Sequence, residues 1–511
     1  MYPLREVRQF LSQEGIGAGI EPKRSDGIPA AVRRYAFALV KQRYSGKEGW
    51  TVLERIANFI RDHFIRSRHL NATRLVAGSF AVIILVGTLL LALPIASRAG
   101  ESQGLFPAFF TATSATCVTG LVVADTFLTW SLFGQVVILI LIQLGGLGFM
   151  TVITLISLAA HRRIGLSERL IMVSTLNLND MDGVVQVVRH ALMGTAFFEL
   201  TGAALLSVRM IPKYGLVRGL WHALFHAVSA FCNAGFDLQG GDTGAFSSLA
   251  GFQNDPLPLL TTAALILIGG LGFFVWEDIW NNRSWKKLTL YSRLVLTLTV
   301  VLTLGGALFF LGAEWNNPAT LGPMETGEKC LNAFFQSATL RTAGFNVIDQ
   351  GAMTDNSLVL SCILMLIGGS SGSTAGGIKT VTAWVLVMVV ITGLRGRENI
   401  VFRGRSLSAR RAMNAVTLFL MVTFLFVTGS MLISLTHEAT FLQAAFETAS
   451  ALGTVGLTTG LTPTLARPAQ ALLAVLMYTG RVGILSFSIA FLNRRKDSLN
   501  IRYPEFSIMV G

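Results

Sequence analysis

Long apolar stretches separated by short polar connections dominate the chain from Leu75 onward. About 20 apolar residues are enough for an α-helix to cross the ~30 Å hydrocarbon layer of a membrane. Seven stretches reach or approach this length: Leu75–Leu93, Leu132–Ala159, Leu257–Ile279, Leu288–Leu311, Ser357–Ile367 with its continuation Val381–Leu394, Ala412–Leu435 and Ala469–Leu492. An eighth stretch, Val184–Val208, is weaker because it contains Arg189, His190 and Glu199. The pattern predicts eight transmembrane helices in a polytopic membrane protein.

A shorter motif recurs between the paired stretches. Its centre is a glycine with a phenylalanine ten residues before it and a large apolar residue directly after it. A serine stands six residues before the glycine in three copies, whereas the third copy has Ala338 there. The four glycines, which stand 115, 109 and 112 residues apart, are Gly120, Gly235, Gly344 and Gly456. The chain therefore contains a fourfold internal repeat of about 112 residues.

Each repeat reads as a span, a half-length apolar segment, a small-residue loop and a second span. The half-length segments are too short to cross a membrane and are Gly104–Ala115, Gly219–Phe231, Glu328–Thr339 and Thr440–Ala451. Irregular backbone at membrane depth is tolerated only where it is buried in protein or lines water. The predicted fold is an all-α polytopic membrane protein with four pseudo-repeats of transmembrane helix, pore half-helix, filter loop and transmembrane helix around one central pore. Along the chain this gives a cytoplasmic basic extension at 1–74, repeats at 75–159, 184–279, 288–394 and 412–492, and a cytoplasmic tail at 493–511.

The loops of the four repeats are candidates for an ion-selectivity filter. Glycine allows a positive φ, so successive carbonyls can face the axis, and rings of carbonyls replace the hydration shell of a monovalent cation. The predicted filter residues are Val118, Thr119, Gly120, Asn233, Ala234, Gly235, Thr342, Ala343, Gly344, Thr454, Val455 and Gly456. The alternative is that the glycines merely mark turns between helices, and four copies at matched spacing favour the filter over it.

A glycine-rich run interrupts the second span of the third repeat. Each glycine costs a helix ~1 kcal/mol relative to alanine, so we expect this run to be unwound. The run comprises Gly368, Gly369, Ser370, Ser371, Gly372, Ser373, Thr374, Ala375, Gly376 and Gly377. It mimics a phosphate-binding loop, but Ile378 separates the last glycine from Lys379 and both flanks are membrane spans. We predict an intramembrane gating loop, with a passive kink as the alternative.

Two arginines fall at membrane depth. Arg481 lies midway along the last span, where a charge is costly and indicates function. We predict that it faces the pore below the filter and binds carbonyls of the gating loop; a structural ion pair is the alternative. Arg341 lies within the third filter segment and is expected to point behind the filter, toward an acid such as Glu447. His222 and His226 are four residues apart like metal ligands, but packing is the favoured interpretation.

Composition and charge agree with a membrane protein. Of 511 residues, 52% are hydrophobic and only 14% are charged, against roughly 25% in soluble domains. Of the 41 Lys and Arg residues, 14 lie in residues 1–74 and 17 more lie in residues 159–169, 281–293, 393–411 and 493–502. This asymmetry places both termini in the cytoplasm and argues against nucleic-acid binding as the origin of the net charge of +13.

Cysteine and acid–base residues give no sign of another chemistry. The four cysteines have no CxxC spacing, so the sequence predicts neither a zinc site nor a disulfide framework. The predicted spans hold no cluster of His, Asp and Cys, so an intramembrane enzyme is a remote alternative. We therefore expect a protein that is not an enzyme.

The repeated motif resembles the Trk/Ktr/HKT superfamily of potassium and sodium transporters, and most of all its KtrB-type ion-translocating subunits. The resemblance rests on Thr111–Leu121 and its three counterparts, on Gln143–Phe149, on Gly269–Phe273 and on the terminal Ile501–Glu505. It covers the chain from about Leu75 onward. The two additional N-terminal spans of Trk-type members are not found.

The resemblance implies one filter glycine per repeat and transported K⁺ at the filter carbonyls. In plant relatives a serine at the first of these positions goes with sodium selectivity, so Gly120 favours K⁺. The resemblance also implies a homodimer with one pore per subunit, docked on a cytoplasmic KtrA/TrkA-like ring of regulatory subunits that bind ATP/ADP or NAD, with no organic cofactor on this chain. The prediction is a potassium-uptake subunit of a bacterial cell membrane; the alternative is a Na⁺-selective or Na⁺/K⁺-coupled transporter of the same architecture.

Overall fold

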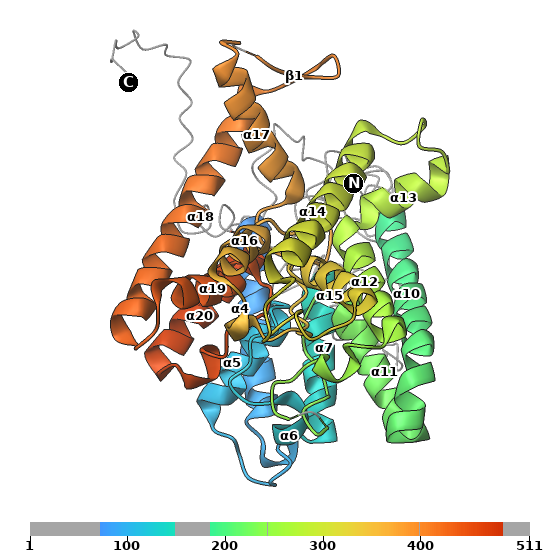
Figure 1. The fold of residues 1–511 in the computed structure, drawn as a ribbon, viewed down its shortest axis with the longest axis vertical. Coiled ribbons are helices and arrows are strands. Elements are labelled where there is room, and N and C mark those ends of the chain that lie inside the picture. The colour runs from blue at the N-terminus through green and yellow to red at the C-terminus, as the bar shows by residue number, and fades with distance from the viewer. Residues whose placement is uncertain (1–71, 149–183, 243, 398, 484–511) are drawn as a thin grey trace, which may run out of the picture. The chain divides into compact units, whose positions relative to one another are not determined.

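The computed structural model describes residues 72–148, 184–242, 244–397 and 399–483. The basic N-terminal extension, most of the connection between the first two repeats and the C-terminal tail lie outside these residues. Helices make up most of the described chain (Figure 1). A two-stranded antiparallel hairpin, β1 (Ile400–Phe402) and β2 (Arg405–Leu407), joins the third and fourth repeats.

Each repeat is built from the same kinds of helix. The first helices are α4 (Ala72–Leu91), α10 (Val184–Tyr214), α14 (Leu290–Glu314) and α18 (Ala409–Thr436). The half-helices are α5 (Leu105–Thr116), α11 (Leu216–Phe231), α15 (Thr326–Thr339) and α19 (Phe441–Gly453). The second helices are α7 (Leu132–Leu147), α12 (Pro256–Leu271), α16 (Asp355–Leu366) and α20 (Arg467–Val482). Shorter elements are η2 (Pro94–Ala96), α6 (Thr126–Thr129), η3 (Ala250–Phe252), α13 (Phe273–Asn282), η4 (Gln350–Ala352), α17 (Thr380–Leu394) and η5 (Thr462–Thr464).

Two of the four half-helices begin at a capping box, whereas α5 and α11 begin after Gly104 and Gly215 without a side-chain cap. In α15, Glu325 and Glu328 form a capping box, and in α19 Thr440 and Gln443 form another. Such boxes satisfy backbone N–H groups that have no partner within the helix. The half-helices are 12, 16, 14 and 13 residues long. At 1.5 Å per residue they are too short to span a bilayer, as the sequence predicted.

Three helices in the described part of the chain are long and apolar enough to cross a membrane alone: Arg189–Tyr214, Leu290–Glu314 and Ala409–Thr436. The predicted single span Leu257–Ile279 is wrong in detail, because α12 and α13 meet at an angle of 92°. Gly272 joins them with a φ of 92°. A helix ends where the backbone turns left-handed, and glycine takes that conformation without steric cost.

Two other second helices also end at a glycine with a positive φ. Helix α7 ends at Gly148 with a φ of 80°, and α20 ends at Gly483 with a φ of 91°. The predicted continuations to Ala159 and Leu492 lie outside the described residues. In the third repeat the break is longer, since the glycine-rich run Gly368–Gly377 separates α16 from α17 and is not helical, as predicted.

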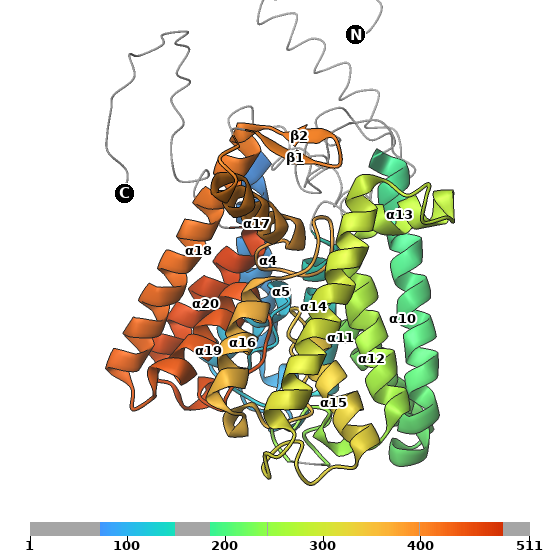
Figure 2. The same ribbon diagram turned by 45° about the horizontal axis from the view of Figure 1, so that its top comes forward.

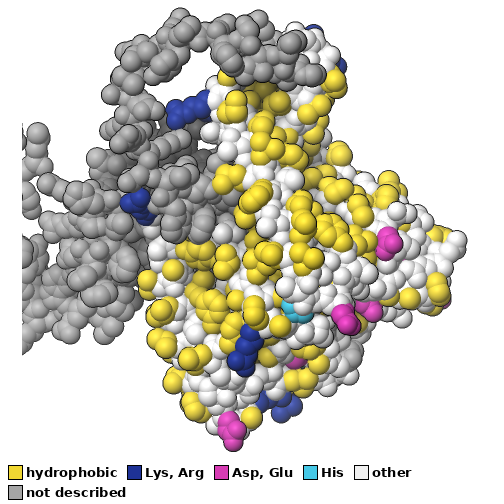
Figure 3. Space-filling model, turned by 90° about the vertical axis from the view of Figure 1, so that its left-hand side faces the viewer, with side chains coloured by type: hydrophobic (Ala, Val, Ile, Leu, Met, Phe, Trp, Pro, Cys, Tyr) yellow, Lys and Arg dark blue, Asp and Glu magenta, His cyan; other side chains and the backbone are white. Residues whose placement is uncertain are grey.

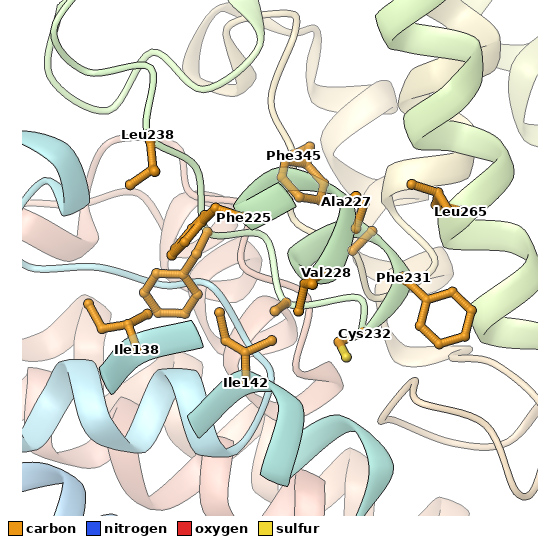
Figure 4. Close-up of a cluster of buried hydrophobic side chains, with 14 of the residues drawn as sticks. Ile138, Ile142, Phe225, Ala227, Val228, Phe231, Cys232, Leu238, Leu265 and Phe345 are labelled. Atoms are coloured by element: carbon orange, nitrogen blue, oxygen red, sulfur yellow. The ribbon is translucent and has the colours of Figure 1, made fainter. Parts of the chain in front are cut away.

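Apolar packing fixes the half-helices between their neighbours. Figure 4 shows the α11 region with Ile138 and Ile142 of α7 on one side and Leu265 of α12 on the other. Phe225 and Phe231 of α11 are fully buried in this cluster. Van der Waals packing of these side chains against α7 and α12 holds the half-helix, which is too short to be stable by itself.

The outer surface is apolar along the long helices. In Figures 1 and 2 the second repeat, in green, and the fourth repeat, in orange to red, lie on opposite sides of the helix assembly. The face that includes α18 shows many hydrophobic side chains and few charged ones (Figure 3). On α18 itself, Phe424 is 68% exposed and Leu435 is 79% exposed. A helix with bulky apolar side chains turned outward is suited to a lipid environment.

Candidate functional site

The four predicted filter segments share one backbone conformation. The residue two positions before each repeat glycine has a positive φ although it is not glycine: 55° at Val118, 59° at Asn233, 67° at Thr342 and 53° at Thr454. The repeat glycines follow with φ of 92° at Gly120, 70° at Gly235, 81° at Gly344 and 101° at Gly456. A positive φ is uncommon outside glycine, and its recurrence at four equivalent positions makes it a feature of the site.

The four glycines lie against one another in a closed ring, which we call the glycine ring. A Cβ atom built on Gly120 would lie 2.5 Å from the carbonyl oxygen of Ala234 and 3.0 Å from Cα of Gly235. The same contacts lead from Gly235 to the third repeat, from Gly344 to the fourth and from Gly456 back to Gly120. Each ring position has a main-chain carbonyl of the next repeat against it, so the ring has no space for a side chain.

Main-chain and side-chain hydrogen bonds hold the segments to their half-helices. Ser114 Oγ accepts the N–H of Gly120 at 3.0 Å, and Ser450 Oγ accepts the N–H of Gly456 at 3.0 Å. In the third repeat, where Ala338 has no hydroxyl, the N–H of Gly344 donates to the carbonyl of Thr339 at 3.4 Å. The serines that recur in the sequence therefore bind the ring glycines in two of the repeats.

The half-helices end at the glycine ring. Their last residues are Thr116, Phe231, Thr339 and Gly453, each within a few residues of its ring glycine. The C-terminus of a helix carries a partial negative charge of about half a unit. Four such ends near one axis create a local field that favours a cation.

On one side of the glycine ring lies a small cavity, the outer cavity, of about 50 Å³. All four ring glycines line it, together with loop residues from every repeat. Asp125 and Asp237 are its acidic lining residues. Burial and the nearby Asp125 raise the pKa of Asp237 to about 6.

On the other side of the ring, the run Gly368–Gly377 is tied to its neighbours by main-chain hydrogen bonds. The N–H of Ser370 donates to the carbonyl of Gly270 at 3.0 Å, and the N–H of Phe273 donates to the carbonyl of Gly372 at 3.0 Å. The N–H of Gly368 donates to the carbonyl of Ile378 at 2.9 Å. The run therefore forms an ordered loop that is packed against the break between α12 and α13.

Cationic side chains bind carbonyls of this loop, and two of them are Arg481 and Lys379. The guanidinium of Arg481 donates to the carbonyl of Thr374 and to those of Gly145 and Gly146, the last at 3.2 Å. Lys379 Nζ donates to the carbonyl of Ala375 at 2.7 Å. The sequence predicted the contact of Arg481 with loop carbonyls, and the hydrogen bonds agree with it. Lys379, which was considered only as part of a phosphate-binding mimic, is a further contact of the loop.

Arg341 points behind its filter segment, as expected, but the predicted partner Glu447 is wrong. The Arg341 guanidinium donates to the carbonyl of Gly368 at 3.4 Å and to Thr380 Oγ1 at 3.2 Å. Glu447 is fully buried and its oxygens accept from Thr458, Thr459 and Thr462 in its own repeat. Because these donors occupy the Glu447 carboxylate, it stabilises the loop after Gly456 and is not available to Arg341.

The two histidines of α11 are packing residues. The His222 ring stacks on Tyr214 with centroids 4.5 Å apart, and His226 Nε2 lies 3.2 Å from Thr262 Oγ1. Among the residues that the structure describes, no group of three or more His, Cys, Asp and Glu side chains could hold a metal ion. Glu199, buried within α10, accepts from Gln143 Nε2 at 3.0 Å.

Glycines of the second helices belong to the site, and the sequence interpretation missed them as structural positions. A Cβ atom on Gly145, Gly269 or Gly480 would collide with the carbonyl oxygen at the end of its own half-helix, on Thr116, Phe231 or Leu452 respectively. The signal was present in the Gly-Gly pairs of Gln143–Phe149 and Gly269–Phe273. These glycines let the half-helix ends approach the second helices closely.

Comparisons with known proteins agree on one group. The sequence profile of the TrkH family, described as cation transport protein, matches residues 61–500. Potassium/sodium uptake protein NtpJ of Enterococcus hirae is 41% identical over 450 residues, which cover 87% of this chain and 98% of that protein. Ktr system potassium uptake protein B of Bacillus subtilis is 39% identical over 451 residues, which cover 88% of this chain and 99% of that protein.

A solved structure has a similar fold. The chain matches the crystal structure of the potassium transporter TrkH from Vibrio parahaemolyticus with a TM-score of 0.64 and 19% sequence identity, over 90% of this chain and 95% of that chain. At this identity the likeness concerns the fold alone. It confirms the prediction of an all-helical membrane protein.

Proposed function

Because the chain belongs to the TrkH family of cation transport proteins, we propose that it is a potassium-uptake subunit of a bacterial cell membrane, with both termini in the cytoplasm. The observation that carries the proposal is the closed glycine ring, in which four segments with the same backbone conformation meet. Two relatives support the choice of ion by their names, which are potassium/sodium uptake protein and Ktr system potassium uptake protein.

In this proposal the glycine ring is the selectivity filter. A K⁺ ion reaches the ring from the outer cavity and exchanges its water for main-chain carbonyls of Val118–Gly120 and the equivalent segments. Ions move inward because the membrane potential is worth ~2.3 kcal/mol per charge per 100 mV. Four half-helix C-termini stabilise the ion while it is dehydrated.

The loop Gly368–Gly377 and Arg481 form the gate of the proposed pore. The loop lies next to the fourth filter segment, since a Cβ atom on Gly376 would collide with Thr454 Oγ1. Arg481 holds the loop by its carbonyls and adds a positive charge beside the ion path. Release of the loop would remove both obstacles to a cation.

We further propose that the subunit forms a homodimer with one pore per subunit and docks on a cytoplasmic KtrA/TrkA-like ring of regulatory subunits. These partners, and not this chain, would bind ATP/ADP or NAD and release the gate. The name of the Bacillus subtilis relative as protein B of a Ktr system supports a multi-subunit assembly.

A Na⁺-selective or Na⁺/K⁺-coupled transporter is the second candidate. The name of the Enterococcus hirae relative includes both ions, which supports it. Glycine at position 120, and not serine, favours K⁺. Both candidates use the same ring and differ only in the ions that cross it.

Ion flux into liposomes tests the proposal. The purified chain is reconstituted, and uptake is measured with K⁺ alone, Na⁺ alone and both ions together. K⁺ uptake that does not require Na⁺ supports the potassium-uptake subunit. Uptake of K⁺ only in the presence of Na⁺ supports the coupled transporter, and the absence of flux of either ion contradicts both candidates.

A further inference from the structure

The outer cavity has one charged position in an otherwise neutral set of equivalent residues. The residues two positions after the four ring glycines all line the cavity, and they are Val122, Asp237, Asn346 and Thr458. They form a second tier directly beyond the glycine ring. Only Asp237 in this tier is ionisable, and no Lys or Arg stands among the residues that line the cavity.

The other acid of the cavity, Asp125, is occupied by the main chain. Its Oδ1 accepts the N–H groups of Phe127 and Leu128 at 2.9 and 2.8 Å, and its Oδ2 accepts the N–H of Phe246 at 3.0 Å. Asp125 therefore caps α6 and fixes the loop of the second repeat. It adds negative charge to the cavity, but its oxygens are already used.

Asp237 is less constrained. It is half-buried, its Oδ1 accepts the N–H of Gln239 at 2.9 Å, and Ser248 is its side-chain hydrogen-bond partner. The cavity is narrow, so a cation in it lies close to the Asp237 carboxylate and to carbonyls of the ring at once. Negative charge in a confined space raises the local concentration of cations and the rate at which they arrive.

We propose that Asp237, as the single carboxylate of the second tier, promotes the access of cations to the glycine ring. The inference rests on the proposed function, because it assigns a role on the outer side of the same ion path. The carboxylate attracts monovalent cations into the cavity before they lose their water, and the neutral residues of the other three repeats leave it as the main charge of the tier. It governs uptake at low K⁺ concentration more than the maximal rate.

The experiment compares Asp237→Asn with the unaltered chain in liposomes over a range of K⁺ concentrations at low ionic strength. We expect uptake at low K⁺ to fall about tenfold, with the maximal rate at saturating K⁺ largely kept. The difference should shrink when an impermeant salt is raised toward 1 M, where screening acts over about 3 Å. Asp349→Asn is the control, because Asp349 is exposed, caps η4 and lines a different cavity.

Moving the carboxylate to another position of the tier separates the effect of the charge from the effect of an altered structure. Asn346 is the equivalent residue of the third repeat, and Asn346→Asp is isosteric. In the double variant Asp237→Asn, Asn346→Asp, uptake at low K⁺ should recover, because the carboxylate has moved to another quarter of the same tier. No recovery, or a single variant that transports like the unaltered chain, would overturn the inference. If the unaltered chain carries no cation, the proposed function fails as well. If the unaltered chain carries K⁺ but the variants do not behave as expected, only the role of Asp237 fails, so the two failures are distinguishable.

Discussion

Arg481 donates a hydrogen bond to the main-chain carbonyl of Thr374, and this contact joins the last helix of the fourth repeat to the loop of the third. The same guanidinium reaches Gly145 and Gly146 of the first repeat. One side chain thus connects three of the four repeats. Arg481 also stands where the first two repeats have the second glycine of a pair, Gly146 and Gly270. The proposed gate therefore includes a position at which the fourth repeat differs from the first two.

Replacing Arg481 should loosen the loop. Hydrogen bonds from a charged group are worth about 1.5–3 kcal/mol, so Arg481→Gln should raise basal K⁺ flux by about tenfold or more. Arg481→Lys should give an intermediate flux, because an ammonium group lacks the planar fork that reaches several carbonyls. The measurement is liposome flux without regulatory subunits. Arg467→Gln, on the exposed N-terminal end of the same helix, is the control. Flux in Arg481→Gln that equals the control would mean that Arg481 has only a structural role.

Shortening the loop provides a test that does not alter the arginine. Deleting Ser371–Ala375 removes the carbonyls of Thr374 and Ala375, to which Arg481 and Lys379 donate. We expect higher flux than in the full chain, since the obstacle below the ring is gone. The same flux assay checks this, with thermal unfolding of the purified variant as the control for folding. Unchanged flux in a folded variant would reduce the loop to a passive break between α16 and α17.

The sequence predicted the elements whose signals are local. The half-helix ends at Phe231 and Thr339 were predicted to the residue, and the glycine-rich run is unwound as expected. The length of an apolar segment and the glycine content of a loop are local properties, so they can be recognised without the fold. The fourfold spacing of the ring glycines also showed that the loops form one set.

The parts that were wrong depend on contacts between distant segments. Hydropathy stays high through Leu271 and Phe273, and a single glycine costs a helix only ~1 kcal/mol, so Leu257–Ile279 reads as one span. The break at Gly272 is stabilised by the third-repeat loop, because the carbonyl of Gly372 accepts the N–H of Phe273. Similarly, Arg341 donates to two main-chain carbonyls and to Thr380 Oγ1, and none of these partners is acidic, so the sequence does not indicate them.

Substitution of Gly120 should change ion preference. Its φ of 92° is a conformation that costs a residue with a Cβ atom about 1–3 kcal/mol, and the new atom would press on the carbonyl of Ala234. Gly120→Ser should therefore distort the ring and reduce the ratio of K⁺ to Na⁺ flux. Growth of potassium-uptake-deficient cells and liposome flux in each ion measure this ratio. An unchanged ratio would remove Gly120 from the filter.

The serines of the repeat should differ in importance. Ser114 and Ser450 accept the N–H groups of Gly120 and Gly456, whereas Ser229 Oγ has no hydrogen-bond partner among the residues that the structure describes. A hydrogen bond contributes about 1 kcal/mol, which corresponds to about fivefold in an equilibrium. We expect Ser114→Ala and Ser450→Ala to lower the K⁺/Na⁺ flux ratio by up to this factor. Ser229→Ala is the matched control and should leave the ratio unchanged. Equal effects of all three substitutions would mean that the hydrogen bonds from the ring glycines to the serines do not determine the ratio.

The paired glycines of the second helices offer the sharpest contrast in packing. A Cβ atom on Gly145 would collide with the carbonyl of Thr116, whereas one on Gly270 would have its nearest neighbour, Asn233 Nδ2, at 3.8 Å. Forcing a carbonyl away from a buried contact is expected to cost about 1–3 kcal/mol or more, so Gly145→Ala should lower thermal stability and flux. Gly270→Ala makes an ordinary contact and favours the helix, so it should fold and transport like the unaltered chain. Thermal unfolding and flux of the two variants decide the matter. If Gly145→Ala were as stable and active as Gly270→Ala, the close approach of α5 and α7 would not be needed to form the ring.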